Sequence, residues 1–497
     1  MKLPFFNRTA KTQQKRYSPY KGGEVGRLLS GMFGSAASAD STMKPNLAKL
    51  RDRARDLERN NEYVARALDL IENGVVGERG FNLQVKGANI NGTLDLPAND
   101  LIERRWKKWS RYATTDGCMS FRDLCAMAIR VKKRDGEFFA QIVKNSAYPD
   151  GIAIHPIEAD RIDIDKNEMS PNGRKIRMGV ELDDFDRPIA YWVINYHPGD
   201  YDFMMNKPEK KYTRVPADQM IHVFKKKRPG QTRGDSDFSP AIFALKMLDG
   251  YRDAEITAAR AAAAKFAVLV SPGGDGIADS FDGDIPQLDY EAGTIQSLPQ
   301  GYDLKMIDPT HPTSAFSEFN KAVLRGIASG IGLSYESLSN DLEGTSYSSI
   351  RQGALLERDL FKNDQQFLIE HFVDKVYRVW LEWGMSVGNL TLNALPIGPD
   401  KFEKFYSASQ WRGRGFQWVD PLKEMNAAVI GLQNGILSMQ DVANNYGRDV
   451  EETFAQIARD KQTAAQFGVI TAFEPFGASK TSVNPIMDDQ EDELQAD

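Results

Sequence analysis

One stretch of this chain, residues 239–332, restricts its possible folds more than any other. Strong helix formers fill 239–266, and Pro240 stands in the first turn, where proline is tolerated. A helix of about 28 residues is roughly 40 Å long, which is unusual in a compact domain. Strand-like pieces between Pro/Gly turns follow over 271–312, and a second helix is expected over 314–332. Short connections place sequential helices side by side, so the stretch predicts a two-helix stalk with a small β insertion at its far end.

Further helices are expected after a polar loop over 333–346. Apolar residues between 350 and 383 recur at the spacing of one helix face, which predicts a helix of about 36 residues. Three shorter helices should end the folded part of the chain, because capping residues and glycines mark their starts and stops. These helices are expected over 420–435, 438–447 and 449–468.

The region before the stalk mixes helices with short strands. A helical pattern starts near Asn46, breaks at Asn60-Asn61 and resumes to Gly74. Alternating segments such as FFAQIVK and RPIAYWVINY, with turn signals between them, extend to about Phe224. Pro and Gly then interrupt a charged run over 224–240, which predicts a hinge. The region is therefore expected to be an α/β domain.

Charge is distributed unevenly along the 497 residues, a length that favours more than one packed region. The net charge is −6, and the last ten residues carry six negative charges and no positive one, so the rest sums to zero. Residues 1–21 are basic and lack acidic residues, and both ends are expected to be flexible charged arms. Tight phosphate binding needs a clustered Lys/Arg surface. The composition therefore predicts only weak contact with DNA.

Neither membrane insertion nor secretion is indicated. The longest nearly apolar stretch, 261–270, contains Lys265 and is much shorter than the roughly 20 residues of a membrane span. The N-terminus lacks the apolar segment of a secretory signal, so the protein is expected to stay in the cytoplasm where it is made. Cys118 and Cys125 are seven apart, which suits neither a zinc site nor a disulfide framework and predicts free thiols.

Enzymatic motifs are missing from the sequence. It contains no GxxxxGK[ST], HExxH or GxSxG pattern, and its five histidines share no ligand-like interval. The strongest metal-like patch is Asp160, Asp163 and Asp165, of which Asp163 and Asp165 would share one face of a strand and could hold Mg²⁺. A solvated strand edge is the alternative. The sequence thus predicts no catalytic residue, cofactor or metal, and a Mg²⁺-dependent phosphoesterase remains the enzymatic alternative.

Several blocks of sequence resemble, in the same order, those of the lambda-like phage portal proteins. RARDLERNNEYVARALDLIENGVVG at 53–77 is similar to the N-terminal signature of that family, similar blocks continue to about 385, and 411–468 resembles the crown region. The further blocks include RDLCAMAIRVKKRDGEFFAQIV, IEADRI, GVELDDFDRPIAYWV, VPADQMIHVF, RPGQTRGDSDFSPAI and LEGTSYSSIRQGALLERD. The resemblance implies a non-enzymatic subunit of a ring, a dodecamer in that family, which surrounds the channel for DNA packaging and ejection.

The resemblance also implies an α+β, multi-region portal fold. Mapped onto this sequence it gives an N-terminal arm (1–45), an α/β wing (46–238), a first stem helix (239–270), a clip (271–312), a second stem helix (313–332), a tunnel loop (333–346), a long helix with wing return (347–410), a helical crown (411–470) and an acidic tail (471–497).

The partners implied by the resemblance are those of a capsid vertex. They are other copies of the chain, the terminase large subunit, major capsid and scaffold proteins, head completion or neck proteins, and double-stranded DNA that passes without sequence specificity. The implied location is the portal vertex of the virion, after assembly in the bacterial cytoplasm. Another kind of phage head or connector protein is the alternative.

Two groups of residues are candidates for contact with DNA in such a channel. Lys321 and Arg325 lie four apart on one face of the second stem helix, where a solvated face is the alternative. The tunnel loop is polar and without positive charge, which suits a channel that reads no base edges, whereas an ordinary surface loop is the alternative. Its candidates are Ser339, Asn340, Asp341, Glu343, Thr345, Ser346 and Tyr347.

Four residues are candidates for contacts between subunits. Arg233 and Asp235 lie in the hinge segment, where they could pair with a neighbouring copy. Gly326 and Gly330 lie in the second stem helix, where small residues permit a neighbouring helix to approach closely.

Overall fold

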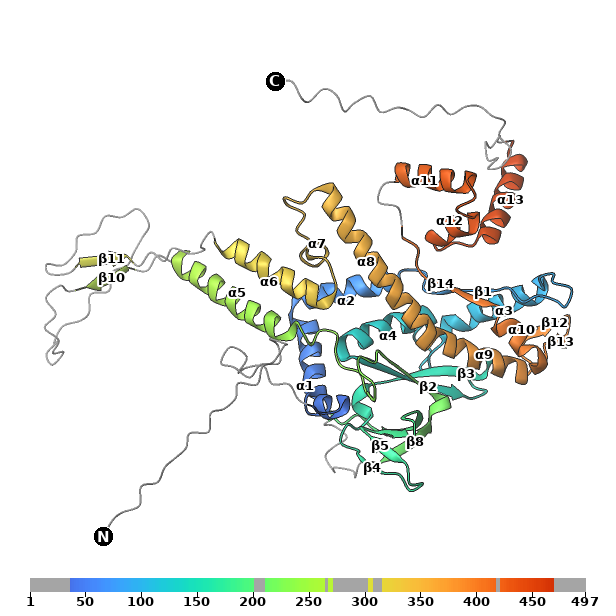
Figure 1. The fold of residues 1–497 in the computed structure, drawn as a ribbon, viewed down its shortest axis with the longest axis horizontal. Helices are drawn as coiled ribbons and strands as arrows, with labels where there is room; N and C mark the ends of the chain where they lie inside the picture. The colour runs from blue at the N-terminus through green and yellow to red at the C-terminus, as the bar shows by residue number, and fades with distance from the viewer. Residues whose placement is uncertain are drawn as a thin grey trace, which may run out of the picture.

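The computed structural model describes residues 36–200, 211–263, 267–270, 303–306, 315–416 and 421–468, with side chains described except at 261–263, 267–270, 303–306, 315 and 347. Figure 1 shows a mixed helix and sheet body, an arm of two helices that projects from it, and a separate helical module near the C-terminus. The arm comprises α5 (Ile242–Ala263) and α6 (Ala315–Ile331), and the C-terminal module comprises residues 421–468.

The body begins with the helix pair that the sequence predicts, α1 (Ala39–Asn60) and α2 (Glu62–Val75). Asn61 separates them, because its backbone is extended and its side chain caps α2 by accepting hydrogen bonds from the N–H groups of Tyr63 and Val64, both at 3.1 Å. The predicted break is therefore confirmed, although α1 starts seven residues earlier than Asn46.

A three-stranded antiparallel sheet in the order β3-β2-β9 lies at the centre of the body. Its strands are β2 (Glu137–Lys144), β3 (Ile152–Ile157) and β9 (Met220–Phe224). Alternate side chains of β2 enter different cores: Phe138, Ala140 and Ile142 enter the main core, and Phe139 enters a second one. Burial on both faces explains why FFAQIVK is almost continuously apolar.

The second core lies under a five-stranded antiparallel sheet in the order β4-β5-β6-β7-β8. Its strands are β4 (Glu168–Met169), β5 (Lys175–Arg177), β6 (Val180–Leu182), β7 (Pro188–Ile194) and β8 (Tyr212–Pro216). β7 occupies most of the predicted RPIAYWVINY strand. The sequence prediction of an α/β region is thus confirmed at the level of a mixed helix and sheet body.

The main core is rich in aromatic rings from distant parts of the chain. The ring of Trp106 lies 4.9–5.5 Å from five others, those of Trp109, Phe121, Tyr377, Trp380 and Trp411. The elements that meet here are α3 (Leu96–Trp109), α4 (Phe121–Asp135), α9 (Asp374–Ser386), α10 (Phe402–Tyr406) and the antiparallel pair β1 (Asn82–Val85) and β14 (Ser409–Arg412). A short hairpin of β12 (Thr391–Leu392) and β13 (Leu395–Pro396) lies beside them.

The two helices of the arm lie side by side, as predicted, and the ring of Tyr251 is 5.0 Å from that of Phe319. The first helix, α5, is described as far as Ala263, and residues 264–266 of the predicted helix lie outside the described residues. β10 (Ala267–Val270) pairs antiparallel with β11 (Asp303–Met306). Residues 267–270, which the family resemblance placed in the first stem helix, are therefore a strand and not a helix, because AVLV has strand propensity and a partner strand. Most of the predicted clip lies outside the described residues.

The sequence predicts a loop over residues 333–346, but the structure contains a short helix within this segment. It is α7 (Tyr335–Ser339), whose N-cap Ser334 accepts a hydrogen bond from the N–H of Ser337 at 3.2 Å. Asn340 ends this helix in the left-handed conformation, with φ 56°. The long helix then runs without a break through α8 (Tyr347–Leu368), a π-helical turn (Ile369–Val373) and α9. This confirms the long helix that the sequence predicts after residue 346.

The C-terminal module contains the three predicted helices, α11 (Pro421–Gln433), α12 (Met439–Asn445) and α13 (Val450–Gln466). Ala428 is the one apolar residue that the described part of this module buries. Large apolar side chains on it are exposed, including those of Leu422, Met425, Val429, Ile430, Ile436 and Phe467. A unit with so small a core needs contacts beyond itself to be stable. Among the described helices, none has the length and apolarity needed to cross a membrane.

Candidate functional site

Residues 333–346, which lie between the arm and the long helix, are held in place by contacts with α6 and α2. Asp341 is the centre of these contacts: its Oδ2 lies 3.4 Å from Lys321 Nζ on α6 and accepts a hydrogen bond from the hydroxyl of Tyr335 at 2.8 Å. The guanidinium of Arg325 lies over the Tyr335 ring, 5.3 Å from its centroid. Arg66 on α2 donates to the carbonyl of Ser337 at 2.8 Å.

These contacts join two groups of candidates that the sequence treated separately. The hydrogen bond from Tyr335 and the charge of Lys321 lower the pKa of the Asp341 carboxyl, so it stays ionised at neutral pH. Glu343 donates its backbone N–H to Asp341 Oδ1 at 3.1 Å, and Ser346 is the N-cap of α8. Ser339, Asn340 and Thr345 lie within the same segment, whereas the side chain of Tyr347 is outside the described residues. Tyr335 and Arg66 are the contributors that the sequence reasoning missed.

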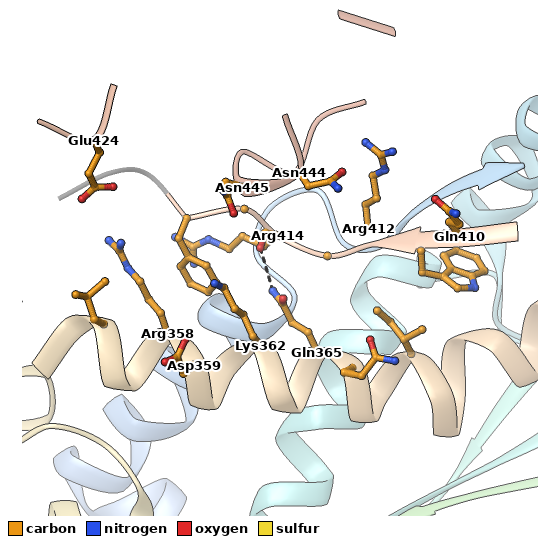
Figure 2. A pocket seen from close by; sticks show the side chains of 17 residues that line it. Arg358, Asp359, Lys362, Gln365, Gln410, Arg412, Arg414, Glu424, Asn444 and Asn445 are labelled. Carbon is orange, nitrogen blue, oxygen red and sulfur yellow. Dashed lines mark hydrogen bonds between the residues drawn. The ribbon is translucent and has the colours of Figure 1, made fainter. Parts of the chain in front are cut away.

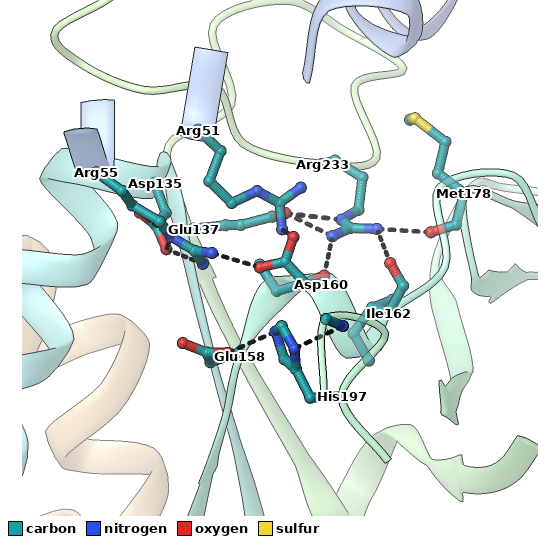
Figure 3. Close-up of polar contacts among 12 residues, drawn as sticks. Arg51, Arg55, Asp135, Glu137, Glu158, Asp160, Ile162, Met178, His197 and Arg233 are labelled. Atoms are coloured by element: carbon teal, nitrogen blue, oxygen red, sulfur yellow. Dashed lines mark hydrogen bonds and ion pairs between the residues drawn. The ribbon is translucent and has the colours of Figure 1, made fainter. Parts of the chain in front are cut away.

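The hinge segment before α5 is held by a fully buried arginine. Arg233 pairs with Glu137, with Nη2–Oε1 at 2.6 Å and Nε–Oε2 at 2.8 Å, and both side chains are fully buried. Its remaining donors reach the carbonyl oxygens of Ala159, Ile162 and Met178 at 2.8–3.1 Å. Figure 3 shows the contacts with Ile162 and Met178. All five N–H donors of the guanidinium are thereby used within the chain.

This geometry corrects the prediction that Arg233 pairs with a neighbouring subunit. A buried guanidinium with no free donor cannot do so without breaking the fold. Asp235 pairs instead with Lys227 of the same segment, Nζ–Oδ2 at 2.9 Å. Gly136, with φ 94°, permits the close packing of this segment, because a Cβ there would lie 2.2 Å from the carbonyl carbon of Asp235.

Two buried groups around this pair have displaced pKa values. Burial raises the pKa of Glu137, but Arg233 and His222 lower it more, so it lies well below the usual range of a carboxyl group. Burial lowers the pKa of His222 to about 4, so its imidazole is neutral while its Nε2 lies 3.1 Å from Glu137 Oε2. The buried pair of Arg233 and Glu137 therefore stabilises the packing of the hinge segment, and the site is not an acid–base centre.

The acidic patch considered for Mg²⁺ is divided among separate partners. Asp160 lies in a 3-10 turn rather than on a strand, and it pairs with Arg55 at 2.8 Å and Arg51 at 3.5 Å, shown in Figure 3. Asp163 accepts a hydrogen bond from Tyr212 at 2.6 Å, and Asp165 is 3.8 Å from Lys44. Ligand atoms of Glu158, Asp160 and His197 do lie within 4.8 Å of one another. A cation there would face two guanidinium groups, which disfavours metal binding.

Gly326 and Gly330 remain on an open face of α6. Among the described residues, a Cβ at Gly326 would meet no atom within 4 Å, and one at Gly330 would meet only Pro240, at 3.9 Å. These glycines therefore permit no close approach within the part of the chain that the structure describes.

A cleft of about 500 Å³ lies between α8 and the segment that joins β14 to the C-terminal module. Figure 2 shows Arg358 and Lys362 of α8 on one side of it and Arg414 on the other. The guanidinium groups of Arg358 and Arg414 both lie 5.6 Å from the ring centroid of Phe416. The floor is fixed by Gln365, whose amide donates to the carbonyls of Arg414 and Val75 at 3.1 and 3.0 Å. Sequence reasoning missed this cleft, because its cations are scattered along the chain.

Comparison with known proteins gives consistent similarities. The sequence model of a family described as "Phage portal protein, lambda family" matches residues 25–365. The chain is 34% identical to a probable portal protein of Halomonas phage phiHAP-1, over 92% of this chain and 88% of that protein. It is 26% identical to portal protein B of Escherichia phage lambda over 90% of each, and 24% identical to the portal protein of Escherichia phage N15 over the whole of both.

Solved structures give a weaker similarity. A chain from the neck of a native gene transfer agent particle, computed with C12 symmetry, has a TM-score of 0.42 and 13% identity, over 80% of this chain and 91% of that one. A chain from the neck of the empty particle has a TM-score of 0.44 and 14% identity, over 81% and 93%.

Proposed function

This chain belongs to the lambda family of phage portal proteins, which are structural and not enzymatic, and on that premise we propose that it forms a closed ring around the path of the viral DNA. The ring would be a dodecamer at the portal vertex of the virion, assembled in the bacterial cytoplasm. It would serve in packaging, in joining the head to the tail and in ejection of the genome.

The observation that carries the ring proposal is the C-terminal module, whose described residues bury one apolar side chain and expose many. On α11, Leu422, Met425 and Val429 follow each other at helical spacing and form one exposed apolar stripe. The arm adds Phe243, 76% exposed, and Met247, 59% exposed. Such surfaces mark protein interfaces. In a ring, where contacts are head-to-tail, a different surface of the adjacent copy would cover them.

The parts of the fold take the order of portal regions under this proposal. The body would be the wing, α5 and α6 the stem, β10 and β11 the base of the clip, 333–346 the tunnel loop and 421–468 the crown. The clip would dock the terminase large subunit and later the head completion or neck proteins, and the outer parts would contact capsid and scaffold proteins. Gly326 and Gly330 on the open face of α6 would receive a neighbouring stem helix.

Purified protein should therefore form rings whose mass is a twelvefold multiple of the 55.7 kDa subunit. Mass photometry or light scattering, combined with negative-stain images, would measure this directly. A protein that stays monomeric at high concentration, and shows no ring in assembled particles either, would contradict the proposal.

Residues 333–346, which include Asp341, would border the DNA path. A change of charge there should slow the translocation of DNA. Replacing Asp341 by lysine breaks the pair with Lys321 and places a new cation beside it. The pair is partly exposed to solvent, where ion pairs contribute little to stability, so rings should still form. The new cation should hold DNA phosphates, and each added phosphate contact steepens the salt dependence of binding by a slope of about 0.9.

In a packaging assay with assembled capsids we expect D341K to package more slowly than the wild type, with a deficit that shrinks as salt rises. D218K is the matched control, because Asp218 is exposed on the body and makes the same charge change. Equal packaging rates for D341K and D218K would place the segment away from the DNA.

A further inference from the structure

The acidic C-terminus is a sequence feature that the ring proposal leaves without a role. Residues 488–497 carry six carboxylates and no cation, and they account for the whole net charge of the chain. A segment of this charge has two ways to lower its energy: it can stay in water, or it can meet a compact group of cations. The described part of the chain offers such a group in the cleft beside α8.

Three cations of the cleft have no acidic partner in the part of the chain that the structure describes. Within the described residues, no carboxylate lies within ion-pair distance of Arg358, Lys362 or Arg414. Arg358 and Arg414 instead contact the ring of Phe416, and Arg414 also donates to the carbonyl of Asn73. These contacts hold the guanidinium groups in place without neutralising their charge.

The other charged residues that line the cleft are Arg412, Glu424 and Asp359. Arg412 pairs with Asp449 at 2.8 Å, and Glu424 pairs with Arg351 at 3.5 Å. Asp359 is exposed next to Arg358. Amide groups of Gln366, Asn444 and Asn445 complete the lining and can donate hydrogen bonds to carboxylates. The cations and amide groups of the cleft therefore suit an acidic, extended ligand.

The chain length permits the acidic segment to reach this cleft. Asn444 and Asn445 line the cleft just before α13, a helix of 17 residues and therefore about 25 Å long. Gly468 follows the far end of α13, and 19 residues, 469–487, lie between it and Asp488. Such a connection spans up to about 66 Å, which exceeds the length of α13 more than twofold.

We propose that residues 488–497 dock in the cleft of Arg358, Lys362 and Arg414. The tether raises the effective concentration of the acidic segment to the millimolar range, so modest ion pairs suffice to fill the site. The filled cleft would present no net positive patch to DNA, consistent with a channel that must not hold its cargo. The proposal concerns the chain itself and does not require that the ring proposal hold.

A zero-length carbodiimide cross-linker tests the contact, because it joins only carboxylates and amines that touch. In full-length protein at low salt we expect Lys362 to be joined to the tryptic peptide 481–497 several-fold more often than any other exposed lysine. The yield should fall at high salt, since screening weakens exposed ion pairs. Replacing Arg358 and Arg414 together by glutamine should reduce the yield at Lys362 while leaving that lysine in place.

K401Q is the matched control, because Lys401 is exposed on the body away from the cleft and its loss should not change the yield. Cross-links spread over all exposed lysines without preference for Lys362 would overturn the proposal. It would equally be overturned if a short DNA duplex protected Lys362 from acetylation to the same degree in full-length protein and in protein truncated after 480, because DNA would then be the occupant.

Discussion

Replacing Arg233 by methionine should lower the free energy of unfolding of the body by about 3–5 kcal/mol, the usual cost of leaving one partner of a buried ion pair alone. Glu137 would remain fully buried beside a neutral histidine, and the carbonyls of Ala159, Ile162 and Met178 would lose their donor. The loss would act on the segment that leads into α5. Chemical denaturation followed by far-UV circular dichroism would measure it.

Two companion variants separate the charge effect from simple damage. R228M removes an exposed arginine of the same segment and should cost less than about 0.5 kcal/mol. Replacing Glu137 and Arg233 together by methionine removes both charges, so it should be less destabilised than R233M alone. If R233M and R228M unfold at the same denaturant concentration, the buried pair does not stabilise the body.

A charged residue in the exposed stripe of α11 should abolish the ring. Val429 belongs to the exposed stripe of Leu422 and Met425, a surface that we propose an adjacent copy covers, and V429D would place an unpaired carboxylate in every interface of the ring. Burying such a charge costs several kcal/mol, and a closed ring repeats the cost at each contact. Mass photometry should show small species instead of rings.

The control for this variant lies on the same helix. K423D changes a neighbouring exposed position that points away from the stripe, and it should leave the ring intact. Circular dichroism of V429D should match that of the wild type, because Val429 is 41% exposed and does not belong to the buried core of the described residues. Rings of normal mass from V429D would show that α11 is not an interface.

Features that depend on neighbours in sequence were predictable. The break at Asn61 and the three C-terminal helices follow from caps and glycine stops within a few residues, and the structure reproduces them. The short helix α7 escaped prediction, although Ser334 is an N-cap, because its five residues are too few for a periodic pattern.

Features that depend on distant pairs were not predictable. Arg233 looked like a surface residue in a charged loop, because its partner Glu137 is 96 positions earlier. The link between Lys321 and Asp341 joins two candidates that the sequence had identified, yet only the return of the chain after α6 brings them together. The cleft cations likewise come from α8 and from the segment after β14, and no local pattern connects them.

The aromatic cluster around Trp106 has an optical consequence. Indole rings of Trp106, Trp109, Trp380 and Trp411 lie close enough for their excited states to couple, so the body should carry an intense near-ultraviolet dichroic signal. The described residues of the C-terminal module include no tryptophan. Near-ultraviolet circular dichroism would therefore distinguish ring dissociation from unfolding of the body. Dissociation should lower the particle mass and preserve the indole signal. Unfolding of the body should abolish the indole signal at any particle mass.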